Sequence, residues 1–206
     1  MSVDLLVFGP HPDDLEIGLG GTIEERLAES QAAAVVIGAA WRENLRWPDR
    51  RIGKDSDQLT QAAAFIRRHR PRVIAVPYWS DRHPDHAAAS DLLTEAAFNA
   101  ALRRYPCEGE AWKAWVCYYF INDSAPPSFV IDVSDYYEKK RGALDCHASQ
   151  FRRTPGSAGT RINTPVFRQL VESRDAQFGA LAGVAWAEGF IVREPIVRES
   201  LMKAAR

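Results

Sequence analysis

The sequence predicts an α/β fold, a three-layer α/β/α sandwich built on a mainly parallel sheet. Short apolar runs alternate along the chain with longer stretches of helix-forming residues, as in parallel strands that are joined by crossover helices. Two clusters of polar residues follow predicted strands, which is where ligands bind in such sheets. The length of 206 residues fits a single domain, residues 1–206.

The N-terminal half predicts an opening strand that is followed by a β-α-β pattern. The first strand ends at Gly9-Pro10, a dipeptide that interrupts regular structure. Asp55 is a favourable N-cap for the helix that precedes the next strand. Residues 32–40 also fit a strand, although their alanines suit the end of a helix. The expected elements are a strand at 3–9, a helix from 18–22 to about residue 38, a helix at 55–69 and a strand at 72–76.

The C-terminal half predicts further strands between helices. Pro84 stands where the first turn of a helix accepts proline, and apolar residues recur behind it at helical spacing. Residues 152–164 are rich in Arg, Gly, Ser and Thr and are expected to form a surface loop. The expected elements are a helix after Pro84, strands at 115–121 and 129–133, and helices at 136–149 and 167–179.

The composition excludes several classes of protein. A chain with 46% hydrophobic and 26% charged residues is neither collagen-like nor disordered. The net charge of -1 predicts no nucleic-acid partner. The longest apolar stretch, residues 32–41, is about half of the roughly 20 residues that a membrane span needs, and no basic segment leads into a signal-peptide core. We therefore expect a cytoplasmic protein with no membrane partner.

Two polar clusters carry the chemistry, and zinc explains their composition best. Imidazole and carboxylate groups bind Zn²⁺, and a catalytic site uses three of them and leaves a fourth position for water. His11 and Asp14 from the first cluster, with His86 from the second, would supply such a set. The clusters are His11-Pro12-Asp13-Asp14-Leu15-Glu16 and Asp81-Arg82-His83-Pro84-Asp85-His86.

The remaining polar side chains of these clusters suit catalytic roles. Asp13 could take a proton from a zinc-activated water. His83 precedes His86 by three residues and could face the substrate. Asp85 could hold the ring of His83 or support the site from outside the ligand set.

Structural explanations compete with this interpretation. Asp residues after a strand often cap helices, and a lone H-x-x-H is as often a pair of surface histidines. The conjunction of both clusters at strand ends of one sheet favours the metal site. We expect His69 and His147 to lie on helix surfaces, away from any metal.

At these residues the sequence resembles the PIG-L/LmbE-like zinc-dependent de-N-acetylases, which have a Rossmann-like sheet. The resemblance runs nearly end to end and rests on His11-Pro12-Asp13-Asp14-x-Glu16, on Gly20-Gly21-Thr22 and on His83-Pro84-Asp85-His86. Several further segments are similar to the branch of bacillithiol-biosynthesis deacetylases. They are Asn44-Leu45, Pro48-Asp49-Arg50, Asp81-Arg82, Ser149-Gln150-Phe151 and Ala187-Glu188-Gly189-Phe190.

The resemblance implies hydrolysis of the acetamide of an N-acetylglucosamine conjugate, such as N-acetylglucosaminyl malate, to the free amine and acetate. It implies a Zn²⁺ cofactor, a small-molecule substrate and a homo-oligomer, in many relatives a hexamer. The family's roles fall on His11, Asp14 and His86 as zinc ligands, on Asp13 as the base, on protonated His83 as the oxyanion donor beside Asp85, and on Arg26 and Arg82 as substrate contacts.

Two departures from the family pattern leave alternatives open. A piece of roughly 30 residues, about one βαβ repeat, is absent between Thr22 and Arg26, so the sheet could lack a strand. The absent piece is either a true deletion or an omission from the sequence. If it is an omission, Arg26 matches a sugar-contacting arginine of the family. Phe167 stands where relatives carry a tyrosine that helps to hold the oxyanion. The alternatives are an amidase of thiol conjugates or a catalytically impaired metal- or sugar-binding relative.

Overall fold

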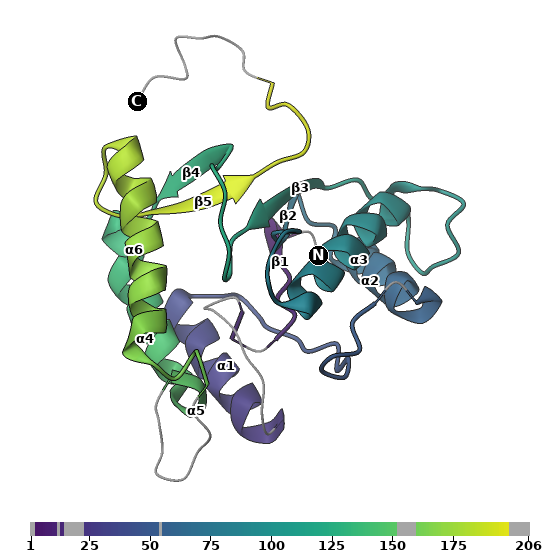
Figure 1. Ribbon diagram of the computed structural model, residues 1–206. Helices are drawn as coiled ribbons and strands as arrows, with labels where there is room; N and C mark the ends of the chain where they lie inside the picture. The colour runs from purple at the N-terminus through teal and green to yellow at the C-terminus, as the bar shows by residue number, and fades with distance from the viewer. Residues whose placement is uncertain (1–2, 12, 15–22, 54, 152–159, 198–206) are drawn as a thin grey trace.

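The computed structural model describes residues 3–11, 13–14, 23–53, 55–151 and 160–197, with the backbone alone for 23–27. Within these ranges the chain forms one five-stranded sheet and helices on both sides of it (Figure 1). The strand order is β1-β2-β3-β5-β4. The strands are β1 (Leu5–Val7), β2 (Val73–Pro77), β3 (Trp115–Tyr119), β4 (Phe129–Asp132) and β5 (Ala187–Ile191).

The helices form two groups. Helices α2 and α3 pack against each other on one side, whereas α6 packs on β5 and α1 packs on α4 at the other side (Figure 1). None of the helices in the described part of the chain is long and apolar enough to cross a membrane. They are α1 (Ile23–Ile37), α2 (Ser56–His69), α3 (Pro84–Ala101), α4 (Tyr137–Cys146), α5 (Ala148–Phe151) and α6 (Pro165–Ala182), with a 3-10 turn η1 (Ser134–Tyr136) before α4.

The sheet is mixed. The pairs β1-β2 and β2-β3 are parallel, as predicted for the first three strands, but β5 runs antiparallel to both β3 and β4. Strand β5 is reached from α6 through Gly183, whose φ of 76° closes the helix in a left-handed turn. The sequence pattern did not predict β5, since Glu188 and Gly189 interrupt its apolar run.

The main core lies between the sheet and the α2/α3 pair. Leu6, Ile74 and Tyr118 point from three neighbouring strands to this side and are buried there. They meet the buried faces of the two helices, whose alanines allow close packing. The helix residues buried in this cluster are Leu59, Ala62, Ala63, Phe65, Ile66, Ala89, Leu92, Leu93, Ala96, Ala97 and Ala100.

The N-terminal elements agree with the predictions in most places. Asp55 caps α2 by accepting hydrogen bonds from the backbone N–H groups of Asp57 and Gln58. The alternative strand at residues 32–40 is wrong, because α1 continues to Ile37 and ends at Gly38, whose φ is 78°.

Two further expectations can be compared with the structure. His147 was expected on a helix surface, but it is fully buried where α4 ends, because the chain turns there into α5.

Residues 38–53 of the described chain form no strand between α1 and α2. Among the strands that the structure describes, β1 therefore lies at the edge of the sheet, paired with β2. Residues 152–159, most of the expected surface loop, lie outside the described residues.

Candidate metal centre

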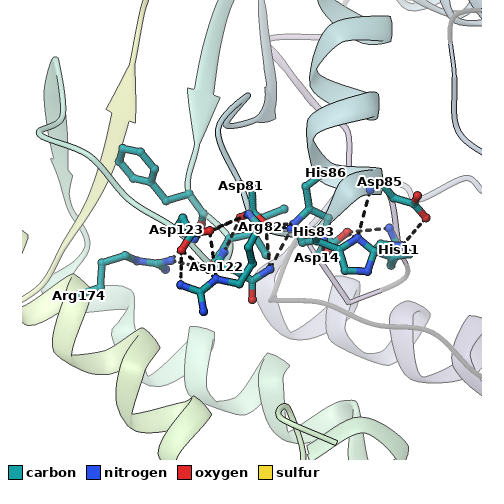
Figure 2. A network of polar contacts seen from close by, with 12 residues as sticks. His11, Asp14, Asp81, Arg82, His83, Asp85, His86, Asn122, Asp123 and Arg174 are labelled. Carbon is teal, nitrogen blue, oxygen red and sulfur yellow. Dashed lines mark hydrogen bonds and ion pairs between the residues drawn. The ribbon is translucent and has the colours of Figure 1, made fainter. Parts of the chain in front are cut away.

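The two polar clusters of the sequence meet at one edge of the sheet. His11, Asp13 and Asp14 follow β1, while His83 and His86 lie at the start of α3, after β2. Because β1 and β2 are parallel neighbours, their carboxyl ends bring the two segments together (Figure 2). All of these side chains except His83 are buried.

Local hydrogen bonds fix each segment. The backbone N–H of His11 donates to Asp14 Oδ2 at 2.8 Å, and the N–H of Asp14 donates to the carbonyl of His11 at 3.2 Å, which closes a tight turn. In the second segment Pro84 occupies the first turn of α3 and His83 is the N-cap. The Nδ1 atom of His83 accepts a hydrogen bond from the backbone N–H of Asp85 at 3.2 Å.

Asp14 lies between two imidazole rings. Its Oδ2 is 2.8 Å from His11 Nδ1, and its Oδ1 is 3.2 Å from His86 Nε2. The second nitrogen of each ring faces a different carboxylate: His11 Nε2 lies 3.4 Å from Asp85 Oδ2, and His86 Nδ1 lies 3.0 Å from Asp81 Oδ1. Ligand histidines in metal sites are held in this way, with one nitrogen on the metal and the other on a carboxylate.

Buried polar atoms in this centre fit a bound cation. Asp14 Oδ1 and His86 Nε2 are both buried and make no hydrogen bond in the described part of the chain, although they lie within ion-pair distance of each other. Buried polar atoms rarely lack a partner, and a metal ion is one way to satisfy them. The donor set of two imidazoles and one carboxylate suits zinc.

Other groupings of donor atoms are also present. The rings of His11, His83 and His86 offer nitrogens within 4.8 Å of one another, as do donor atoms of His11, Asp49 and Asp85. His83 could bind a metal only through Nε2, since its Nδ1 accepts the Asp85 N–H, whereas Asp14 contacts both His11 and His86 and is the third ligand that the sequence predicts. Asp49 is exposed, so it lies at the rim of the centre and not inside it.

The electrostatics of the centre favour positive charge. Burial lowers the pKa of His86, but the nearby Asp14 and Asp81 carboxylates raise it to about 10. Burial raises the pKa of Asp14, yet its hydrogen bond with His11 and its ion pair with His86 bring it well below its ordinary value. The pKa of His11 is raised, because the Asp14 carboxylate outweighs the effect of burial. The carboxylates of the centre therefore favour positive charge, carried by the protonated rings or by a bound cation that replaces their protons.

His83 has a different environment from the other two histidines. Its ring centroid lies 4.6 Å from that of His86 and 4.9 Å from that of His11. Burial, and then the positive charges of His86 and His11, lower the pKa of His83. With Nδ1 accepting the Asp85 N–H, the neutral ring carries its proton on Nε2. The structure thus favours a neutral N–H donor over the protonated ring that the resemblance implies.

Asp81 organises the centre, a role that the sequence did not reveal. This buried carboxylate accepts hydrogen bonds from the backbone N–H of His83 at 2.8 Å and from the N–H of Asn122 at 2.8 Å, in addition to its contact with His86. It also accepts from the Asn122 side-chain amide at 3.1 Å and the Asp123 N–H at 3.2 Å. Asn122 and Asp123 follow β3, so Asp81 ties together the ends of β2 and β3 (Figure 2).

Two arginines bind carboxylates around the centre. Arg82, a predicted substrate contact, forms an ion pair with Asp123 through its guanidinium, although its side chain is about half exposed (Figure 2). Arg50 was not in the predicted set, yet its N–H and its guanidinium donate to Asp85 at 2.9 and 3.0 Å. The Pro48-Asp49-Arg50 segment was noted for its resemblance alone, and only the fold shows that it reaches Asp85.

Some predicted site residues lie outside the candidate metal centre or outside the residues that the structure describes. Arg26 belongs to α1, but its side chain lies outside the described part of the chain, as do Gly20, Gly21 and Thr22. Phe167 is buried in an apolar cluster with Ile121, Leu144 and Val171.

Comparison with known proteins gives a consistent picture. Residues 23–97 match the profile of the family described as PIG-L, GlcNAc-PI de-N-acetylase. The chain is 26% identical over 228 residues to the diacetylchitobiose deacetylase of Thermococcus kodakarensis, covering 90% of this chain and 81% of that protein. It is 25% identical over 153 residues to the 1D-myo-inositol 2-acetamido-2-deoxy-alpha-D-glucopyranoside deacetylase of Rhodococcus jostii, covering 58% of this chain and 52% of that protein.

A solved structure resembles the whole chain. The conserved protein TT1542 from Thermus thermophilus superposes with a TM-score of 0.84 at 30% identity, covering 97% of this chain and 98% of that one.

Proposed function

We propose that the chain is a zinc-dependent hydrolase that removes the N-acetyl group from an N-acetylglucosamine conjugate. The match of residues 23–97 to the PIG-L family profile and the similarity to sugar deacetylases support this proposal. The products would be the free amine and acetate. One observation carries the proposal: His11 and His86 each direct one ring nitrogen at Asp14 and the other at an outer carboxylate. This arrangement suits two histidine ligands and one carboxylate ligand of a catalytic zinc.

Zinc in this centre would lower the pKa of a water molecule from 15.7 to about 7 and polarise the acetamide carbonyl. Asp13 is buried directly beside Asp14 in the turn after β1. We assign it the role of general base, which takes a proton from the attacking water and returns one to the leaving amine nitrogen.

His83 is assigned to the developing oxyanion of the tetrahedral intermediate. The Asp85 N–H occupies its Nδ1, so its Nε2–H is the group that can donate to substrate. Asp85 in turn contacts His11 and Arg50, which makes it a positioning residue for this side of the centre.

The substrate assignment rests on the relatives. By name, the matched deacetylases act on acetylated amino sugars, which favours a sugar acetamide over a thiol conjugate or a protein without turnover. N-acetylglucosaminyl malate stays a prediction from the resemblance to the bacillithiol branch. Contact of Arg26 and Arg82 with substrate, a homo-oligomer such as a hexamer, and a cytoplasmic location are likewise predictions.

The test is acetate release by the zinc-loaded protein from a panel of acetylated amino sugars. The panel contains N-acetylglucosamine, diacetylchitobiose, an N-acetylglucosaminyl inositol and N-acetylglucosaminyl malate. We expect turnover of at least one conjugate, with about one zinc per chain. His86→Ala should lose the zinc, whereas Asp13→Asn should keep it and lose most turnover, since its amide cannot accept a proton at neutral pH.

A matched control keeps this test specific. Asp91→Asn makes the same chemical change on the exposed surface of α3 and should retain both zinc and activity. Full zinc content in His86→Ala would move the ligand set elsewhere, and an Asp13→Asn variant with normal kcat would remove Asp13 from the mechanism. Absence of acetate from every substrate by a zinc-loaded protein would reject the proposed function.

A further inference from the structure

One arginine of α6 reaches the segment that follows β3. Arg174 lies in the middle of the helix, and its side chain is 12% exposed. Its Nη1 group donates to two carbonyl oxygens, that of Phe120 at 3.1 Å and that of Ile121 at 2.8 Å (Figure 2). Both acceptor residues are buried and come directly after β3. One guanidinium therefore holds two consecutive peptide groups where β3 ends.

The next two residues of the chain hold a carboxylate of the candidate metal centre. The N–H groups of Asn122 and Asp123 donate to Asp81 Oδ2 at 2.8 and 3.2 Å. Asp81 Oδ1 lies 3.0 Å from Nδ1 of His86, a proposed zinc ligand. The end of β3 is therefore two hydrogen bonds away from the ring of His86.

The Ile121–Asn122 peptide group joins Arg174 to Asp81. Its carbonyl oxygen accepts from Arg174 and its N–H donates to Asp81, and the planar peptide fixes the direction of one bond relative to the other. The guanidinium keeps its charge, and hydrogen bonds to charged groups are shorter and stronger than neutral ones. Linked hydrogen bonds also polarise one another. Arg174 therefore affects both the direction and the strength of a hydrogen bond that Asp81 receives.

Arg174 also has a contact of a purely structural kind. Its Nε donates to Asp175 Oδ1 at 3.1 Å. The other oxygen of Asp175 accepts from the Tyr137 hydroxyl at 3.1 Å and lies 2.7 Å from Lys140 Nζ. This network ties α6 to α4, and a structural role for Arg174 requires nothing more. The two roles differ in what they predict for zinc binding.

We propose that Arg174 is a positioning residue for the metal centre and acts on His86 through the chain of hydrogen bonds that ends at Asp81. The proposal rests on the proposed function, which makes His86 a zinc ligand. In the described part of the chain, none of the hydrogen bonds of Arg174 reaches a proposed ligand. Replacing Arg174 should therefore weaken zinc binding while the ligand set stays complete.

The first measurement compares the zinc affinities of Arg174→Met and Arg67→Met, by competition with a chromophoric chelator. Arg67 is a matched control, because its buried guanidinium also donates to backbone carbonyls, among them those of Ala100 and Leu102 at the C-terminal end of α3. We expect Arg174→Met to bind zinc about tenfold more weakly, the lower end of the range for loss of an outer partner of a ligand histidine. Arg67→Met should lose stability but bind zinc like the wild type.

The second measurement tests the route through Asp81. If Arg174 acts through this carboxylate, Arg174→Met should add little to a protein that already carries Asp81→Asn. We expect the double variant to bind zinc within about twofold of Asp81→Asn alone, which is the usual error of additivity. Losses that multiply in full would show that the two residues act independently and would overturn the proposal.

A second pair of variants covers the case in which Arg174→Met does not fold. Arg174→Lys and Arg67→Lys keep the charge but not the planar fork of donors, so the loss of zinc affinity should again be confined to the Arg174 variant. Wild-type zinc affinity in the Arg174 variant, or an equal loss in the Arg67 variant, overturns the positioning role.

Acetate release separates this proposal from the proposed function. If zinc affinity falls as expected but the wild type hydrolyses no acetylated amino sugar, the positioning role is supported and the proposed function is rejected. If the wild type releases acetate and Arg174→Met binds zinc normally, only the positioning role is rejected. A wild-type chain that binds no zinc overturns both.

Discussion

Replacing Asp81 with asparagine should weaken zinc binding without changing a proposed ligand. The variant keeps the size of the side chain but turns one acceptor oxygen into a donor. That donor faces N–H groups, because all five contacts of the carboxylate come from nitrogen atoms: His83 N, His86 Nδ1, Asn122 N and Nδ2, and Asp123 N. His86 loses the carboxylate that holds its ring.

The structure gives the size of the effect. A hydrogen bond to a charged group contributes about 1.5–3 kcal/mol, and at least two such contacts share the altered oxygen, so the free energy of unfolding should fall by about 3 kcal/mol or more. Loss of an outer carboxylate on a ligand histidine lowers metal affinity about 10–100-fold, or about 1.4–2.7 kcal/mol. The Asp81→Asn variant should therefore show both a lower free energy of unfolding and a weaker zinc affinity.

Two measurements check this prediction. Zinc affinity comes from competition with a chromophoric chelator, and unfolding free energy comes from urea titration of the metal-free protein. Asp91→Asn on the exposed side of α3 is the control and should change neither quantity. An Asp81→Asn protein that binds zinc as tightly as the wild type would refute the view that Asp81 positions His86.

Three further predictions follow from other contacts. Arg67→Met should lower the free energy of unfolding by about 3 kcal/mol or more and leave zinc affinity unchanged, because the buried guanidinium donates to the carbonyls of Ala100, Leu102, Cys107 and Gly109. His83→Ser and His83→Ala should lose turnover equally, while only the alanine variant should lose stability, since serine can still cap α3. The metal-free protein should lose stability as pH rises from 6.5 towards 10, because the pKa of His86 is raised from 6.5 to about 10 in the folded state and the stabilising proton is lost over that interval.

Each of these three predictions has its own control. Arg68→Met changes an exposed neighbour of Arg67 and should have little effect, so equal destabilisation by both variants contradicts the role of Arg67. Full turnover of His83→Ser would end the assignment of His83 to the oxyanion. Metal-free His86→Ala should show a flatter dependence of Tm on pH, and an identical slope would assign the effect to other groups.

Local sequence patterns predicted the elements that local forces determine. Asp55 as an N-cap and Pro84 in the first turn of α3 needed only neighbours within a few residues, and both stand where the sequence placed them. Strand β5 was missed because its pairing with β3 and β4, not its own short and interrupted pattern, makes it a strand.

The candidate metal centre likewise combines features that the local sequence predicts with contacts that only the fold creates. Both polar clusters were recognised from their composition, and the parallel pairing of β1 and β2 brings them together. The contact of Arg50 with Asp85 spans 35 residues and that of Asp81 with Asn122 spans 41, so neither has a signature in the local sequence. These contacts depend on the register of the sheet and the path of the loops, which no spacing rule describes.

The short edge strand β1 has a consequence for how the molecule responds to metal. Only three residues pair it with β2, yet it carries the turn with His11 and Asp14, while His86 lies far along the chain on α3, beyond α1, α2 and β2. A zinc ion held by both segments would act as a removable cross-link that closes a long loop, much as a disulfide does. Removing it should therefore open the N-terminal strand first, and amide hydrogen exchange of Leu5–Val7 would speed up before that of the β2–β3 pair.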